Sequence, residues 1–129
     1  MKHILKEMLV FFIFLVGGID SALISLAVVM LIDYITGVSS AIYNKKLNSK
    51  IGLKGIIKKL CYLGGVGLAV IVDKVCGQTG VFRTLVIYFL IANDGISIIE
   101  NMAEMNIPLP KKLIKILEQL KKDNDEEGE

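Results

Sequence analysis

Long apolar stretches with few charges fill most of the first hundred residues, and they limit what this chain can fold into. The stretches cover residues 4–16, 21–43, 56–75 and 81–99. A helix that crosses a bilayer needs about 20 mostly apolar residues. The hydrophobic fraction of 53% is ordinary for a soluble domain, but 129 residues provide too little polar surface to cover stretches of this length. The sequence therefore predicts an all-α membrane protein.

The apolar region from residue 4 to residue 43 is too long for one span, and a turn divides it. Gly17 and Gly18 are followed by Asp20 and Ser21, a combination that ends one helix and begins another. The segment before this turn is short for a full crossing, so we expect three to four transmembrane helices, with four preferred. The predicted parts are a transmembrane domain over residues 1–104, an amphipathic helix over residues 105–122 and an acidic disordered tail over residues 123–129.

The lysines form three groups that predict the orientation in the membrane, because cytoplasmic loops are enriched in Lys and Arg. Lys2 and Lys6 precede the first apolar segment. The second group separates the second apolar segment from the third and consists of Lys45, Lys46, Lys50, Lys54, Lys58 and Lys59. The third group follows the fourth apolar segment and consists of Lys111, Lys112, Lys115, Lys121 and Lys122. Four crossings place every group in the cytoplasm, whereas three leave Lys2 and Lys6 outside. We therefore expect both termini in the cytoplasm.

Polar residues recur on one face of the second and fourth segments, at spacings of three and four that belong to one side of a helix. These candidate pore-lining or intramembrane polar residues are Asp33, Thr36, Gly37 and Ser40 in one stripe, and Asn93, Asp94, Ser97 and Glu100 in the other. Asn44 continues the first stripe, and Asn101 and Glu104 continue the second. A carboxylate at the centre of a bilayer costs about 2.5–3.5 kcal/mol, so it normally faces water or a partner. Two hypotheses follow: the stripes line a water-filled assembly, or they hydrogen-bond to each other inside a dry bundle.

Other residues of the apolar segments suggest contacts between helices. Asp73 and Arg83 flank a glycine turn at residues 77–80, which predicts an ion pair across the hairpin, with a gating or subunit contact as the alternative. Gly64, Gly65, Gly67 and Ala69 make one side of the third segment thin, and Gly64, Gly65 and Ala69 are candidates for close helix packing.

The C-terminal stretch alternates an apolar face with lysines. The apolar residues are Leu113, Ile114, Ile116, Leu117 and Leu120. This pattern is typical of an interfacial helix on anionic lipid headgroups, and a contact between subunits is the alternative.

No arrangement of residues is typical of an enzyme. His3 is terminal and has no orienting partner, and Cys61 and Cys76 are about 22 Å apart if one helix carries both. The net charge of +2 and the absence of Trp argue against nucleic-acid binding. We therefore expect no catalytic residues, no metal, no cofactor and no nucleic-acid partner.

Four motifs in order carry a family resemblance over roughly residues 30–120. They are Leu-Ile-Asp-Tyr-Ile-Thr-Gly at 31–37, Asn-Ser-Lys-Ile-Gly-Leu-Lys-Gly-Ile-Ile-Lys-Lys at 48–59, Asn-Asp-Gly-Ile-Ser-Ile-Ile-Glu-Asn at 93–101 and Pro-Leu-Pro-Lys-Lys-Leu at 108–113. The chain resembles the toxin-secretion/phage-lysis holin family of Gram-positive bacteria and their phages, a phage holin family 4-like sequence. The resemblance implies a homo-oligomer in the bacterial cytoplasmic membrane that opens pores or lesions and releases an endolysin or a toxin.

Two questions stay open at this stage. Phage lysis and toxin release are not distinguished, and a small four-helix drug or cation exporter is the alternative function, although the first segment has no acid beyond Glu7. Met8 is either a second translation start that omits Lys2 and Lys6 or an ordinary internal methionine.

Overall fold

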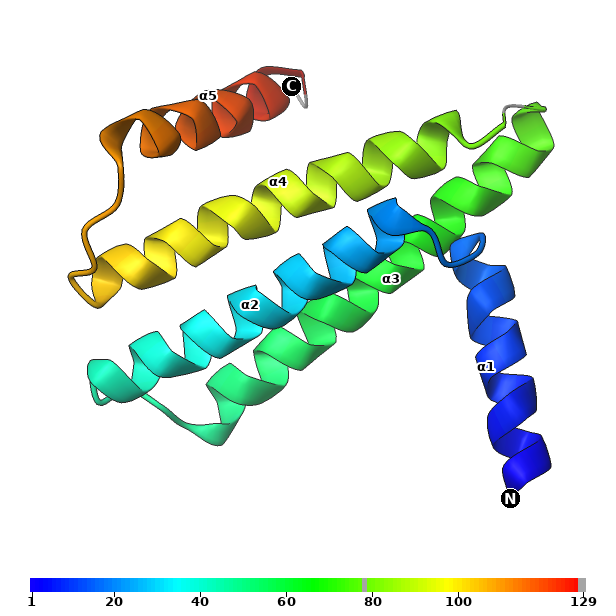
Figure 1. Cartoon of the computed structure of the whole chain (residues 1–129), viewed down its shortest axis with the longest axis horizontal. Helices are drawn as coiled ribbons and strands as arrows, with labels where there is room; N and C mark the ends of the chain where they lie inside the picture. Colours follow the sequence, from blue (N-terminus) through cyan, green and yellow to red (C-terminus); the bar gives the residue numbers. More distant parts are fainter. Residues whose placement is uncertain (78, 128–129) are drawn as a thin grey trace.

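A computed structural model describes the backbone of residues 1–77 and 79–127, and the side chains through residue 116 and at residues 118, 119 and 122, with residue 78 left out. All regular secondary structure in these residues is helical (Figure 1), which confirms the predicted all-α class. The helices are α1 (Lys2–Val16), α2 (Ser21–Tyr43), α3 (Ser49–Cys76), α4 (Val81–Glu104) and α5 (Lys111–Glu127).

Local capping chemistry sets the helix boundaries. The carboxylate of Asp20 accepts a hydrogen bond from the Leu23 N–H at the start of α2, and the Asn48 side chain does the same for Ile51 in α3. Gly17 and Gly77 end α1 and α3 with φ of 80° and 68°, a left-handed conformation that glycine adopts without steric cost. The turns that begin at Gly17 and Gly77 therefore lie at their predicted positions.

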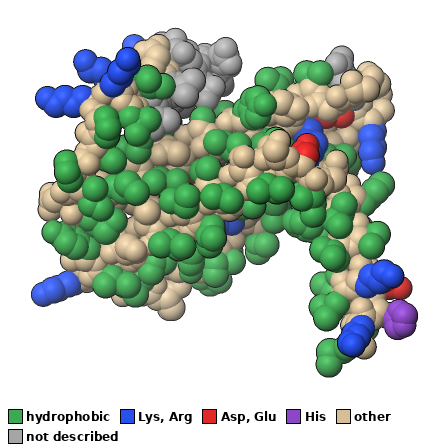
Figure 2. All heavy atoms as spheres, in the orientation of Figure 1, with side chains coloured by type: hydrophobic (Ala, Val, Ile, Leu, Met, Phe, Trp, Pro, Cys, Tyr) green, Lys and Arg blue, Asp and Glu red, His purple; other side chains and the backbone are tan. Residues whose placement is uncertain are grey.

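Helices α2, α3 and α4 lie side by side in a bundle in which α3 runs antiparallel to the other two; α2 and α4 run parallel and form the most extensive interface (Figure 1). Its core contains Leu26, Met30, Val66 and Ile87. Apolar side chains cover much of the visible face (Figure 2). The exposed apolar residues of these three helices include Leu31, Ile35, Leu53, Leu68, Leu85 and Tyr88. A soluble monomer rarely exposes so much contiguous apolar surface, whereas lipid tails cover it without cost.

Within the part of the chain that the structure describes, three helices are long and apolar enough to cross a bilayer: α2 with 23 residues, α3 with 28 and α4 with 24. This agrees with the lower end of the predicted three to four. Helix α1 has 15 residues, which corresponds to about 22 Å, against a hydrocarbon core of about 30 Å. It also leaves the bundle steeply instead of running beside α2 (Figure 1).

Helix α5 begins at Lys111, after the two prolines, and folds back along α4 (Figure 1). Its backbone stays helical to residue 127, five residues past the expected boundary at residue 122. No Gly or Pro interrupts residues 111–127, so nothing in the local sequence stops the helix earlier. Residues 128 and 129 of the predicted tail lie outside the described residues.

Candidate functional site

Lys59 joins two carboxylates in the interior of the bundle. Its Nζ lies 2.8 Å from Asp94 Oδ2 and also pairs with the carboxylate of Asp33. The three residues come from α2, α3 and α4, so one group of charges connects all three helices. The side chain of Asp94 has no exposed surface, and those of Asp33 and Lys59 are 9% and 13% exposed. We call Asp33, Lys59 and Asp94 the charge cluster.

The charge cluster continues into hydrogen bonds between α2 and α4. Asn101 Nδ2 donates to Thr36 Oγ1 at 3.0 Å and to Asp33 Oδ1 at 3.3 Å. One turn further along α2, Ser40 Oγ donates to a carboxylate oxygen of Glu104 at 2.7 Å. The two polar stripes predicted from the sequence therefore face each other within one chain, as the dry-bundle hypothesis requires. Pore lining concerns an assembly of several chains and stays a prediction.

The remaining stripe residues take different positions. Asn93 donates a hydrogen bond to the Tyr62 hydroxyl of α3, while Gly37 and Ser97 line a cavity described below. Glu100 lies on the exposed side of α4. Thus the structure brings most of the predicted residues to the bundle interior, with Glu100 as the exception.

Lys59 is not among the site residues predicted from the sequence, because it belongs to the second group of lysines, which predicts the orientation in the membrane. A signal for it exists in the sequence. Two aspartates within apolar spans need a cation, and Lys59 lies at the inner edge of the basic region that precedes the third apolar span. Asp33 and Asp94 share one ammonium group, so the cluster carries a formal charge of −1. Asp94 Oδ1 is buried and has no hydrogen-bond partner among the described residues.

Arg83 forms a second polar site at the opposite end of the bundle. Its Nε donates to the carbonyl of Val16 at 2.6 Å, and its Nη2 donates to the carbonyl of Gly18 at 2.9 Å. Its Nη1 lies 2.7 Å from a carboxylate oxygen of Asp20. The hydrogen bond from Arg83 lowers the pKa of Asp20 below its usual value. Arg83 therefore fastens the turn between α1 and α2 to α4.

The expected side-chain ion pair between Asp73 and Arg83 is replaced by another arrangement. The Asp73 carboxylate accepts hydrogen bonds from the backbone N–H groups of Phe82 and Arg83 at 2.9 and 3.0 Å, which caps the start of α4. The guanidinium group instead binds Asp20 and the carbonyls of the neighbouring turn. The two residues do meet, but through the backbone, because unpaired amides at a helix start compete for the carboxylate.

The predicted packing residues contribute unequally within one chain. Ala69 is buried, whereas a Cβ added at Gly64 or Gly65 would meet no atom within 4 Å. The close approach occurs at Gly67, on the same thin side of the segment, where an added Cβ would lie 3.0 Å from Leu15 Cδ1 of α1. Gly64 and Gly65 therefore remain predictions for contacts between chains.

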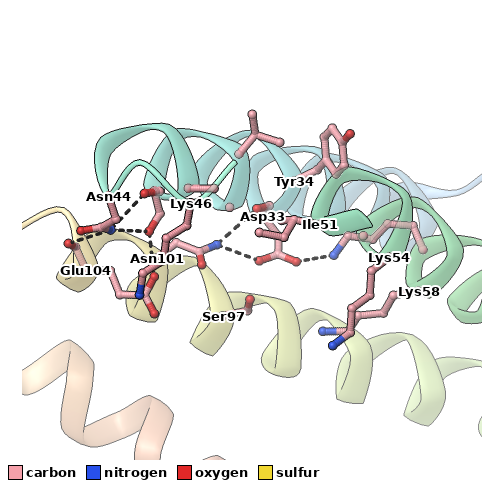
Figure 3. A pocket seen from close by; sticks show the side chains of 16 residues that line it. Asp33, Tyr34, Asn44, Lys46, Ile51, Lys54, Lys58, Ser97, Asn101 and Glu104 are labelled. Atoms are coloured by element: carbon pink, nitrogen blue, oxygen red, sulfur yellow. Dashed lines mark hydrogen bonds and ion pairs between the residues drawn. The ribbon is translucent and has the colours of Figure 1, made fainter. Parts of the chain in front are cut away.

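A cavity of about 680 Å³ opens between α2, α3 and α4, near the loop that joins α2 to α3 (Figure 3). Asp33 and Lys59 of the charge cluster line it, together with polar and basic residues of the three helices and of the loop between α2 and α3. These include Ser40, Asn44, Lys46, Lys54, Lys58 and Glu104. Within the described residues, no group of three His, Cys, Asp or Glu side chains is placed to hold a metal ion.

Comparisons with known proteins agree with the resemblance in the motifs. The family model of the bacteriophage holin family matches residues 10–122. The chain is 44% identical over 110 residues to an uncharacterized 14.9 kDa protein of Clostridium perfringens, covering 84% of this chain and 83% of that protein. It is 33% identical over 102 residues to a probable holin of Bacillus phage phi105, covering 79% and 76%. No solved structure matches. This chain belongs to the bacteriophage holin family.

Proposed function

We propose that this holin self-associates in the bacterial cytoplasmic membrane and permeabilises it, so that an endolysin or a toxin can leave the cell. The observation that carries the proposal is the charge cluster inside a bundle whose outer surface is apolar. A passive anchor needs no ionised side chains within its spans, because each one costs free energy there. A protein that must present a polar face to water in one of its states does need them.

The polar residues of α2 and α4 support two arrangements of the same chain. In the closed bundle they bond to each other, as Asn101 does with Thr36. In an assembly the same faces would turn toward a water-filled lumen shared by several copies. Three spans of one chain are too few to enclose a channel wide enough for a protein, so the proposal requires a homo-oligomer.

The proposed orientation places the basic loop at residues 44–48 and α5 in the cytoplasm, with the turn at residues 77–80 outside. The lysines of α5 would then meet anionic headgroups at the inner surface. Lys2 and Lys6 favour a cytoplasmic N-terminus as well, which requires α1 to cross a thinned bilayer. Three crossings, with the N-terminus outside, form the alternative.

Induced expression in a bacterium tests the function. We expect abrupt growth arrest together with collapse of the membrane potential, read from a potential-sensitive dye, and a ladder of crosslinked species in the membrane. An exporter would leave both growth and potential intact. If the protein accumulates in the membrane while the potential holds and crosslinking yields a single monomer band, the proposal is wrong.

A further inference from the structure

The cavity between α2, α3 and α4 has an excess of positive charge. Its lining includes four lysines and two carboxylates: Lys46, Lys54, Lys58, Lys59, Asp33 and Glu104. The two carboxylates are already engaged, since Asp33 pairs with Lys59 and Glu104 accepts a hydrogen bond from Ser40. The lining therefore has a formal charge of +2, or +1 when Asp94, the second partner of Lys59, is included. Among the described residues, the ammonium groups of Lys46, Lys54 and Lys58 form no ion pair, so they remain for an outside ligand.

Two of these lysines are placed to act together. Lys54 and Lys58 are one turn apart on α3, at a spacing that puts both on the same side of the helix. Both side chains reach toward the cavity in Figure 3, with Lys46 on its other side. Lys58 also lies over the ring of Tyr62, with Nζ 5.6 Å from the ring centroid.

The position of the cavity corresponds to the level of lipid headgroups. Lys54 and Lys58 precede the most apolar part of α3, and the Tyr34 ring packs against the same turn of α3 at Gly55, 3.2 Å from a Cβ added there. Tyrosine is enriched where membrane and water meet. Next to the cavity, Ile35 of α2 and Leu53 of α3 are 53% and 58% exposed, which provides apolar surface for acyl chains.

We propose that this cavity binds the headgroup phosphate of an anionic glycerophospholipid, with Lys54 and Lys58 as its main ligands. Basic pockets between transmembrane helices on the cytoplasmic side are suited to such headgroups. The volume of about 680 Å³ lies within the range of small-molecule sites. The site differs from the headgroup contact proposed for α5, because it is formed by helices of the bundle itself. A free phosphate ion shares the same chemistry and is separated by the experiment.

The test measures thermal unfolding of the full chain in detergent with added phosphatidylglycerol, phosphatidylcholine or inorganic phosphate. We expect phosphatidylglycerol alone to raise the unfolding midpoint. Lys54→Gln/Lys58→Gln should weaken its apparent affinity about thirty-fold, the effect expected for two lysines at an anionic headgroup. Lys54→Arg/Lys58→Arg should keep the binding, which separates loss of the site from loss of the fold.

Lys45→Gln/Lys50→Gln is the matched control, because it removes the same charge from the same region and neither residue lines the cavity. Equal weakening in this control would show general charge attraction and overturn the site. An equal rise with inorganic phosphate would overturn the lipid as ligand, and an equal rise with phosphatidylcholine would overturn the role of the anionic headgroup. Pore formation is not needed for this measurement, so its outcome is independent of the proposed function.

Discussion

Replacement of Lys59 by methionine removes the cation that joins Asp33 and Asp94 while keeping a side chain of similar length. The two carboxylates then lie near each other in the bundle interior without the ammonium group that lies 2.8 Å from Asp94. Removal of one partner from a buried ion pair costs about 3–5 kcal/mol, because an uncompensated charge remains. We expect Lys59→Met to lower the free energy of unfolding by about this amount, measured by denaturant titration in mixed micelles.

Two further variants make the Lys59 result specific. Lys58→Met removes a lysine at the adjacent position of α3 that contacts the Tyr62 ring, and it should cost less than about 1 kcal/mol. A triple variant, Asp33→Asn/Lys59→Met/Asp94→Asn, removes all charge from the cluster and should recover most of the loss, because neutral replacement of a buried ionic group is often harmless. The explanation of the charge cluster is wrong if the free energy of unfolding of Lys59→Met lies within about 1 kcal/mol of that of the parent chain. It is also wrong if the triple variant is as unstable as Lys59→Met.

Four other predictions follow from the same structure. In a background with Cys61 and Cys76 replaced by serine, an impermeant thiol reagent should label Thr79→Cys and not Ser49→Cys; His3→Cys decides between four crossings, which protect it, and three, which expose it. Asp33→Asn should change the ion selectivity of the permeabilised membrane if the α2 stripe lines a lumen, whereas unchanged selectivity with altered assembly would favour the dry bundle. Arg83 lowers the pKa of Asp20 in the folded chain, so their ion pair stabilises the fold at pH values above the ordinary carboxyl pKa of 3.8, and this contribution is lost as the pH falls below that value. Asp20→Asn should therefore reduce the dependence of the free energy of unfolding on pH in this acidic range. An unchanged dependence would contradict the role of the ion pair. A chain that begins at Met8 should lyse cells earlier than the full chain if Lys2 and Lys6 hold the N-terminus inside. Moving each positive charge outward against the membrane potential costs about 2.3 kcal/mol per 100 mV. Equal lysis times for the two chains, with no delay in Met8→Leu, would contradict the dual-start hypothesis.

The features predicted correctly depend on neighbours in the sequence. Asp20 caps the helix that follows it, and Gly17 and Gly77 end the helices before them, so these boundaries can be found within a few residues. The start of α3 was not predicted: α3 begins at Ser49, after the cap Asn48, seven residues before the apolar stretch at residues 56–75, because a polar and basic composition does not prevent a helix. The stripe that contains Asp33 and Thr36 was also predictable, because it depends only on the helical repeat.

The features that were missed depend on how the helices align with each other. The position of α3 along α2 determines which lysine of α3 reaches Asp33, and in this fold it is Lys59. The sequence of either helix alone does not predict this alignment. Arg83 illustrates the same point, since a long side chain selects among several carbonyls and carboxylates that only the folded turn brings within reach. The end of α5 was placed too early because acidic composition was given more weight than the lack of a helix-breaking residue.

The apolar outer surface of α2, α3 and α4 has a consequence for the balance between one chain and many. In water, covering such a surface would drive chains together strongly, but in a bilayer the surrounding lipid is as apolar as a neighbouring helix. Contact between two copies therefore gains little from hydrophobic burial. If the chain assembles as proposed, a few polar groups decide between the closed bundle and the assembly. Replacement of one side chain such as Asp33 or Asn101 should then shift the time at which the proposed opening of the membrane occurs.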